Sequence, residues 1–208
     1  MREISASLIV ETVARLAVEA CCRLPSDLRE MLDHSARQET SPLGRDVLRQ
    51  LVENADIAAA ESMPLCQDTG LAVVFADIGQ DVHVIDGDFE EAVHKGVARG
   101  YGKGYLRASV VAEPLFERAN PGDNTPAIIH TRLTPGDRIH LTLAPKGAGS
   151  ENKSALAMLV PADGIEGVKR FVVDTVRAAG SSPCPPMVIG VGIGGNMEVA
   201  ALCAKRAA

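Results

Sequence analysis

The hydrophobic pattern of the chain changes its period close to residue 63, and this change limits the folds available to it. Up to about residue 62, apolar residues recur at helical spacing. The β-branched segment 71–79 (LAVVFADIG) then predicts a strand. We therefore expect an α+β fold, in which an N-terminal helical part (1–62) is followed by a mixed β-sheet with packed helices (63–208). Both parts are expected to belong to a single domain.

Caps, turns and periodicity predict the individual elements. Helices are expected over residues 3–22, 26–37, 43–62, 89–100, 152–160, 164–179 and from Met197 onward, with Ser26, Asp88 and Asn196 as N-caps. Strands are expected at 71–79, 82–85 and 186–192. The segments 127–133 and 138–144 flank a Thr-Pro-Gly-Asp turn, which predicts a β-hairpin. The last helix reaches Ala208 without a stop signal, so we expect a chain truncated at its C-terminus.

Composition excludes several classes of protein. The 208 residues carry a net charge of −6 and no Trp, which argues against nucleic-acid binding. No apolar run approaches the length of a membrane span, and Glu3 and Glu11 interrupt the N-terminal apolar stretch as no signal peptide would. A cytoplasmic protein is expected. Its five cysteines would then stay reduced, as thiols or metal ligands.

Two cysteines lie in segments that suggest chemistry. Cys66 begins the run Cys-Gln-Asp-Thr-Gly at the junction between a helix and a strand, which places a thiol beside an acid. Cys184 lies between prolines on a stiff turn, as ligands of iron–sulfur clusters often do, although a buried small apolar residue is an equal alternative. The other cysteines, Cys21, Cys22 and Cys203, are expected to be core or boundary residues.

Glycine-rich turns allow a second interpretation. The segment 190–195 (GVGIGG) has the spacing of a dinucleotide-binding turn, and 146–154 (KGAGSENKS) approaches a P-loop. The alternatives are a tight strand-to-helix turn and a cradle for an oxyanion or carboxylate. Arg107 follows a Gly-Lys-Gly entry and is either a fork for a carboxylate or a surface residue. The scattered histidines suggest no metal site.

The segments PLCQDTG, KGAGSENKSAL and CPPMVIGVGIGGNMEVAALCAKRA together closely resemble the class I fumarate hydratases and the related L-tartrate dehydratases. The resemblance is to their N-terminal or α part, which is a separate subunit in many organisms, and it covers nearly the whole chain. It implies a hydro-lyase for a small dicarboxylate, with a [4Fe–4S] cluster whose fourth iron acts as a Lewis acid.

The resemblance also implies roles for individual residues. Cys66 and Cys184 would be cluster ligands, and Asp68 would be the catalytic acid for the departing hydroxyl group. The substrate would be bound by the Gln67 side chain, the Arg107 side chain and the backbone N–H of Gly149.

A partner follows from the same resemblance. The third ligand and the proton-abstracting base would lie beyond this chain, so turnover would need a β subunit or C-terminal domain, and a homodimer is compatible with this. Fumarate and L-malate are the expected substrates, with L-tartrate second. Two alternatives remain open at this point: a catalytically inert scaffold or assembly domain, and a nucleotide-binding module that uses the glycine-rich turns.

Overall fold

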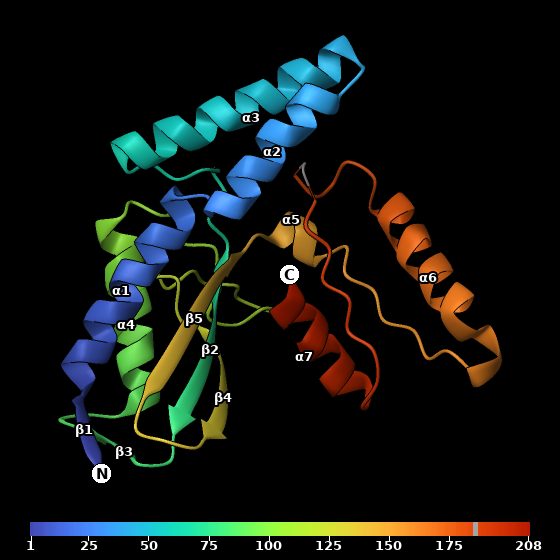
Figure 1. The fold of residues 1–208 in the computed structure, drawn as a ribbon. Helices are drawn as coiled ribbons and strands as arrows, with labels where there is room; N and C mark the ends of the chain where they lie inside the picture. The colour runs from blue at the N-terminus through green and yellow to red at the C-terminus, as the bar shows by residue number, and fades with distance from the viewer. Residues whose placement is uncertain (185–186) are drawn as a thin grey trace. The chain divides into compact units, whose positions relative to one another are not determined.

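The computed structural model describes residues 1–184 and 187–208 and divides into two compact units, Met1–Gly147 and Ala148–Ala208 (Figure 1). The first unit contains β1 (Arg2–Ser5), α1 (Ala6–Cys22), α2 (Ser26–Gln38), α3 (Pro42–Glu61), β2 (Leu71–Gly79), β3 (Val82–Ile85), α4 (Phe89–Lys103), β4 (Ile128–Thr134) and β5 (Ile139–Lys146). The second contains α5 (Ala148–Glu151), a 3₁₀ turn (Pro161–Asp163), α6 (Gly164–Ala179) and α7 (Met197–Ala207). The predicted α+β class is confirmed. Its extent as one domain over 1–208 stays a prediction.

The main sheet has the strand order β4-β2-β5, with β2 parallel to β4 and antiparallel to β5. Strand β2 is apolar on both faces from Ala72 to Ala76, as expected of a strand that is paired on both edges. The predicted hairpin of 127–133 with 138–144 is therefore wrong, because β2 lies between the two strands. The turn between them crosses the end of β2, where the Gly79 N–H donates to the Arg138 carbonyl at 2.8 Å.

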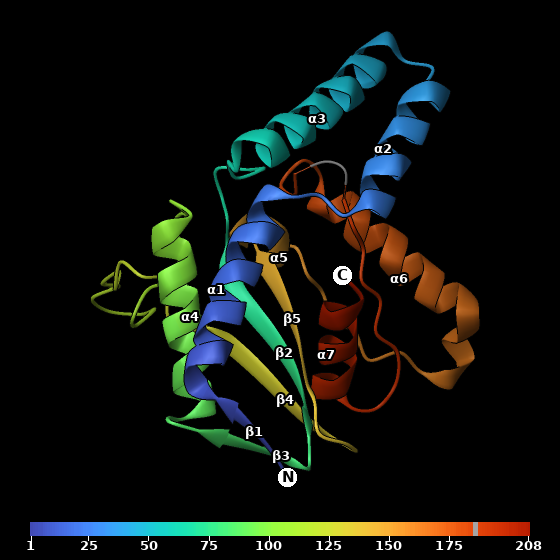
Figure 2. The same ribbon diagram turned by 60° about the vertical axis from the view of Figure 1, so that its left-hand side comes forward.

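Helices α1 and α4 pack against each other and cover one face of this sheet (Figure 2). The core between these layers is built from small and β-branched residues, including Val13, Ala17, Val74, Val93 and Val97. Glycines let the two helices approach closely, since a Cβ on Gly96 would lie 2.6 Å from the Val13 Cβ. A smaller parallel pair, β1 with β3, delays the start of α1 to Ala6, whose N-cap is Ser5.

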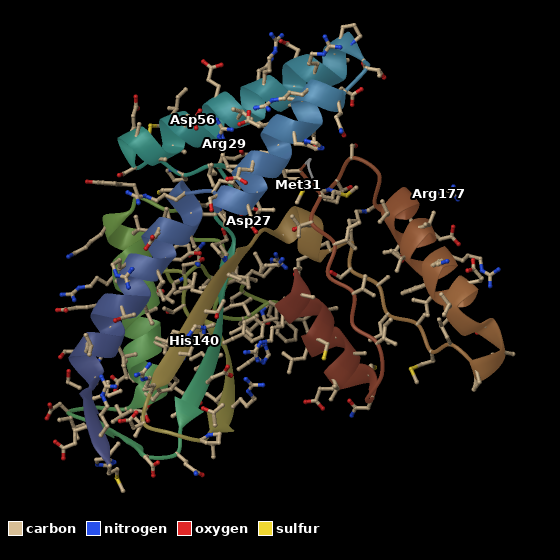
Figure 3. The ribbon with its side chains drawn as sticks, viewed as in Figure 1. Asp27, Arg29, Met31, Asp56, His140 and Arg177 are labelled. Carbon is tan, nitrogen blue, oxygen red and sulfur yellow. The ribbon has the colours of Figure 1, made fainter. Side chains whose placement is uncertain are left out.

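Helices α2 and α3 form a hairpin that extends beyond the end of α1 (Figures 1 and 2). Its side chains bury little, and a fork–fork ion pair joins Arg29 to Asp56 with contacts of 3.1 and 2.9 Å. Figure 3 shows these two residues close together where the helices face each other. The predicted cap Ser26 is instead the first residue of α2, and the capping position is Pro25, which has no side-chain bond.

In the second unit two predicted elements are absent from the described residues. Residues 152–160 contain no helix: their large apolar side chains are exposed, so packing does not stabilise one, and Pro161 disfavours helical backbone at Val160. Residues 187–192 form no strand: they run along α7, and a Cβ on Gly192 would lie 2.0 Å from the Ala200 carbonyl oxygen. The remaining predicted residue of that strand, Pro186, lies outside the described residues.

The other local expectations agree with the structure. Asp88 and Asn196 cap α4 and α7 by accepting the N–H of Glu91 and of Val199, each at 2.9 Å. The helices predicted over 43–62 and 164–179 are present as α3 and α6. Along the described part of the chain, no helix combines the length and apolarity needed to cross a bilayer.

Candidate active site

The loop between α3 and β2 carries three of the predicted site residues and is tied at both sides. Helix α3 ends at Glu61 and is followed by the C-cap Ser62, whose backbone is left-handed with φ 54°. The Leu65 N–H then donates to the Cys21 carbonyl at 2.8 Å, and its carbonyl accepts from the Asn54 amide at 2.9 Å. These two bonds fix the loop against α1 and α3 immediately before Cys66.

The Asp68 carboxylate is held by the turn that its own sequence predicts. Its Oδ1 accepts the Gly70 N–H at 3.1 Å and lies 3.4 Å from the Ser109 hydroxyl. Gly70 has φ 65°, and a Cβ there would lie 2.3 Å from the backbone of Lys146, so only glycine fits. A Cβ on Gly147 would lie 3.2 Å from the Asp68 Oδ2. Two glycines therefore let the start of β2 and the end of β5 close around this carboxylate.

Thr69 connects the loop to the segment that carries Arg107. The Thr69 hydroxyl accepts the Arg107 N–H at 2.9 Å and lies 3.4 Å from its carbonyl oxygen. On the other side, the Tyr101 hydroxyl donates to the carbonyls of Thr69 and Gly70 at 3.1 and 3.2 Å. Burial, followed by the nearby Cys21 and Asp68, raises the pKa of Tyr101, so this donor stays protonated.

Three predicted site residues line one pocket of about 300 Å³, a volume suited to a small molecule. They are Cys66, Gln67 and Arg107, and the pocket is completed by Met63, Pro64, Thr69 and Tyr105. The Cys66 sulfur lies 3.4 Å from the Gln67 side-chain oxygen. Cys66, Gln67 and Arg107 thus line the same pocket, beside the turn that holds Asp68.

The two other predicted site residues, Gly149 and Cys184, belong to the second unit. Gly149 lies in the single turn α5, and a Cβ there would be 3.1 Å from the Ser182 carbonyl oxygen. The exposed Cys184 follows two residues after Ser182. The unit therefore brings the Gly149 backbone to the segment that carries this thiol.

The five thiols differ in their access to solvent. Cys21 and Cys22 are buried, as predicted, and burial raises the pKa of both, that of Cys21 to about 12. Cys66 is half-buried and Cys184 is exposed. Cys203 is also exposed, so its predicted burial is wrong: it lies on a face of α7 that no described residue covers.

The donor chemistry of Cys66 and Cys184 fits an iron–sulfur group, because thiolates are the ligands such clusters use and both thiols are accessible. Among residues 1–184 and 187–208, no cluster of three or more Cys, His, Asp or Glu side chains is arranged to hold a metal ion. Cys66 and Cys184 are thus residues that could act as individual ligands of such a group.

Comparison with known proteins assigns the family. The model of the fumarate hydratase (Fumerase) family matches residues 10–208. The chain belongs to the fumarate hydratase family. The predicted family is thereby confirmed, and the chain corresponds in sequence to the α part of a hydro-lyase.

The similar proteins include a putative L(+)-tartrate dehydratase subunit alpha from Methanocaldococcus jannaschii, which is 41% identical over 96% of this chain and 71% of its own length. The L(+)-tartrate dehydratase alpha subunits of Escherichia coli and Shigella sonnei are 28% and 27% identical, over 96% of this chain and 66% of theirs. The chain thus spans about two thirds of the length of most of these curated relatives.

Two polar residues beside the site of this fumarate hydratase family member, Ser109 and Asn124, are not predicted from the sequence. Ser109 contacts the Asp68 carboxylate, and Asn124 is fully buried behind it. Asn124 belongs to the segment Gly-Asp-Asn-Thr-Pro, which is typical of an exposed turn. No local signal in that segment indicates burial.

Proposed function

We propose that this chain is the α part of an iron–sulfur hydro-lyase that interconverts a small 2-hydroxy dicarboxylate with its unsaturated or oxo product. The substrates proposed are fumarate and L-malate, or L-tartrate. The observation that carries the proposal is the pocket in which Cys66, Gln67 and Arg107 meet beside the Asp68 turn. The proposed setting is the cytoplasm, where these thiols stay reduced.

Different residues would bind the substrate and the cluster. The Arg107 guanidinium group would form paired hydrogen bonds to one substrate carboxylate, and the Gln67 amide would orient the same end of the molecule. The backbone N–H of Gly149 would bind a substrate oxygen from the second unit. Cys66 and Cys184 would hold the iron–sulfur cluster, which when bound supplies Lewis-acid chemistry at the substrate hydroxyl group.

Asp68 would act as the general acid that protonates the departing hydroxyl group. In the elimination direction, the C–O bond breaks and the Asp68 carboxyl gives its proton to the leaving oxygen, which departs as water. The proton on the adjacent carbon would be taken by a base of the partner subunit or domain. Asp68 is suited to this step because Gly70 and Ser109 hold one carboxylate oxygen in a fixed position.

The structure does not favour the nucleotide-binding alternative. A dinucleotide fingerprint needs a strand before its glycines, and residues 187–192 form none. Gly190 and Gly192 instead pack against α7, where a Cβ on Gly190 would lie 2.1 Å from the Ala204 carbonyl oxygen. Likewise, the turn after Lys146 opens the single-turn helix α5 and not the long helix of a P-loop protein.

The experiment compares two variants in the holoenzyme, assembled with the partner subunit and reconstituted anaerobically with iron and sulfide. Asp68→Asn is expected to keep the iron content and lose turnover of fumarate or L-tartrate by about 10²–10⁴-fold. Cys66→Ser is expected to lower the iron content and the activity together. Asp81→Asn, an exposed acid beyond the far end of β2, is the matched control and should be fully active.

Two outcomes would contradict the proposal. An Asp68→Asn holoenzyme with full iron and a near-normal rate would show that the carboxylate only shapes the turn. A wild-type complex that takes up no iron and turns over neither dicarboxylate would favour the scaffold alternative.

A further inference from the structure

Polar side chains are rare in the interior of this protein, and they gather at one place. Among residues 1–184 and 187–208, the buried polar or charged residues are Thr69 and Asn124, which are 6% and 0% exposed. Burying a polar group is unfavourable unless its hydrogen bonds are made, so such groups mark positions where a specific geometry is held. Both residues border the turn that holds Asp68.

The Asn124 amide bridges two segments that are far apart in the sequence. Its Oδ1 accepts the Ser109 N–H at 2.7 Å, and its Nδ2 donates to the Gly70 carbonyl at 3.1 Å. Asn124 has φ 61°, in the left-handed region that asparagine tolerates better than most residues. The side chain is thus bonded at both of its polar atoms and is closed to solvent.

The two residues that Asn124 bonds both contact Asp68. The Gly70 N–H and the Ser109 hydroxyl both lie within hydrogen-bond distance of the same Asp68 oxygen, at 3.1 and 3.4 Å. Asn124 therefore holds Gly70 and Ser109, two of the groups around this oxygen, at a fixed separation. Asn124 acts from the interior, since no part of its side chain reaches the surface where a substrate would bind.

We infer that Asn124 is a positioning residue for the reaction, whose amide sets the aim of the Asp68 carboxylate through Gly70 and Ser109. This inference rests on the proposed function. A misplacement of about 1 Å at a catalytic group can cost about 10²-fold in rate. Because Asn124 does not line the pocket and bonds two residues that contact Asp68, its loss should act on turnover more than on substrate binding.

The test compares Asn124 with Asn120, an exposed asparagine of the same loop. The Asn120 amide likewise donates to a carbonyl, that of Ala108 at 2.9 Å, and accepts an N–H, that of Gly122 at 2.8 Å. Both positions are changed to Gly, which adopts φ 61° without strain, and separately to Asp, which keeps the acceptor and loses the donor. Steady-state kinetics are measured on the holoenzymes, and amide hydrogen exchange on the chains alone.

For Asn124→Gly we expect kcat to fall about 10- to 100-fold with KM within about threefold, together with faster exchange at the Ser109 amide. Asn124→Asp should lose kcat as well while Ser109 stays protected, and it decides the matter if Asn124→Gly does not fold. Both Asn120 variants should match the wild type.

An active wild type with unchanged kcat in both Asn124 variants would overturn the inference and leave the proposed function standing. A rise of KM alone, or equal losses at Asn120, would also overturn it. A wild-type holoenzyme that turns over neither dicarboxylate would instead overturn the proposed function, and this inference with it.

Discussion

The Thr69 hydroxyl joins the loop that carries Asp68 to the segment that carries Arg107. It satisfies the backbone of Arg107 on both sides, with distances of 2.9 and 3.4 Å to the N–H and the carbonyl. Water cannot easily take the place of the Thr69 hydroxyl as acceptor of the Arg107 N–H, because Thr69 is only 6% exposed. The Thr69 hydroxyl therefore helps to hold the backbone from which the Arg107 side chain reaches the pocket.

Thr69→Val, which removes the hydroxyl group at almost constant volume, should lower the free energy of unfolding by about 1–3 kcal/mol, because the Arg107 N–H loses its acceptor. In the holoenzyme it should raise KM more than it lowers kcat, since Arg107 is proposed to bind substrate. Thr69→Ser keeps the hydroxyl group and should retain most of both. Denaturant unfolding and steady-state kinetics measure the effects. Equal stability of the Val and Ser variants would show that the hydroxyl bond contributes nothing.

For single residues, the sequence predicts hydrogen bonds between near neighbours in the chain and does not predict those between distant segments. The Asp68 turn follows from a carboxylate two residues before a glycine, a bond that the sequence itself suggests. The contacts of Asn124 reach Ser109 and Gly70, which are 15 and 54 residues away. Contacts of this kind exist only after the sheet has formed, so no local pattern could reveal them.

Close approach of α1 and α4 depends on glycines along one face of α4. A Cβ on Gly96 would lie 2.6 Å from the Val13 Cβ, and one on Gly100 would lie 2.8 Å from the Ala14 carbonyl oxygen. Gly102, in the same helix, faces open space. Close packing therefore requires glycine at Gly96 and does not require it at Gly102, so the two positions can be compared within one helix.

Gly96→Ala should destabilise the protein by about 1–3 kcal/mol, because the added methyl group forces the helices apart. Gly102→Ala should instead stabilise it by up to about 1 kcal/mol, the usual gain of helix propensity. Thermal and urea unfolding of the two variants measure the difference. Two stabilising substitutions would mean that the helices can separate without cost.

An exposed ion pair between Arg29 and Asp56 joins the two helices of the α2–α3 hairpin. The hydrogen bond to Arg29 lowers the pKa of Asp56 from 3.8. A carboxylate whose pKa falls on folding stabilises the folded state above its unfolded value, and this contribution is lost as pH falls through the folded value. The pairing of α2 with α3 should therefore weaken in acid.

We expect Asp56→Asn to lower stability at pH 7, and the difference from the wild type to shrink as the pH falls below 3.8. Urea unfolding followed by circular dichroism between pH 7 and pH 3 measures it. Glu61→Gln, at the exposed end of the same helix, is the control and should change stability little at pH 7. A difference between Asp56→Asn and the wild type that grows in acid would contradict the assignment of the ion pair.

Among the elements, periodicity and caps predicted the helices of the first unit, whereas strand pairing was wrong in one respect. The Thr-Pro-Gly-Asp turn is present, but it joins two strands that are separated by β2. A turn sequence specifies a reversal of direction and not the neighbours of the two strands. The strongly apolar β2 takes the central position because both of its faces are buried there.

On the scale of the whole molecule, the chain offers accessible thiols but no complete ligand set among its described residues. After anaerobic reconstitution, we expect the chain alone to retain fewer than the ~4 irons of a full cluster, and the complex with its partner subunit to retain about that number. Iron analysis and visible absorption of both samples measure this. A full cluster on the chain alone would contradict the shared site and would make Cys203 the candidate third ligand.

The position of β2 between β4 and β5 also affects how the protein is made. During synthesis β2 emerges first, and both of its edges remain open until residues 128–146 have followed. Open edges on an apolar strand are templates for pairing with other chains. The nascent protein should thus be most prone to aggregation over this interval, and slowing the ribosome while β2 has left the exit tunnel but β4 and β5 have not should reduce its soluble yield more than slowing it after all three have emerged.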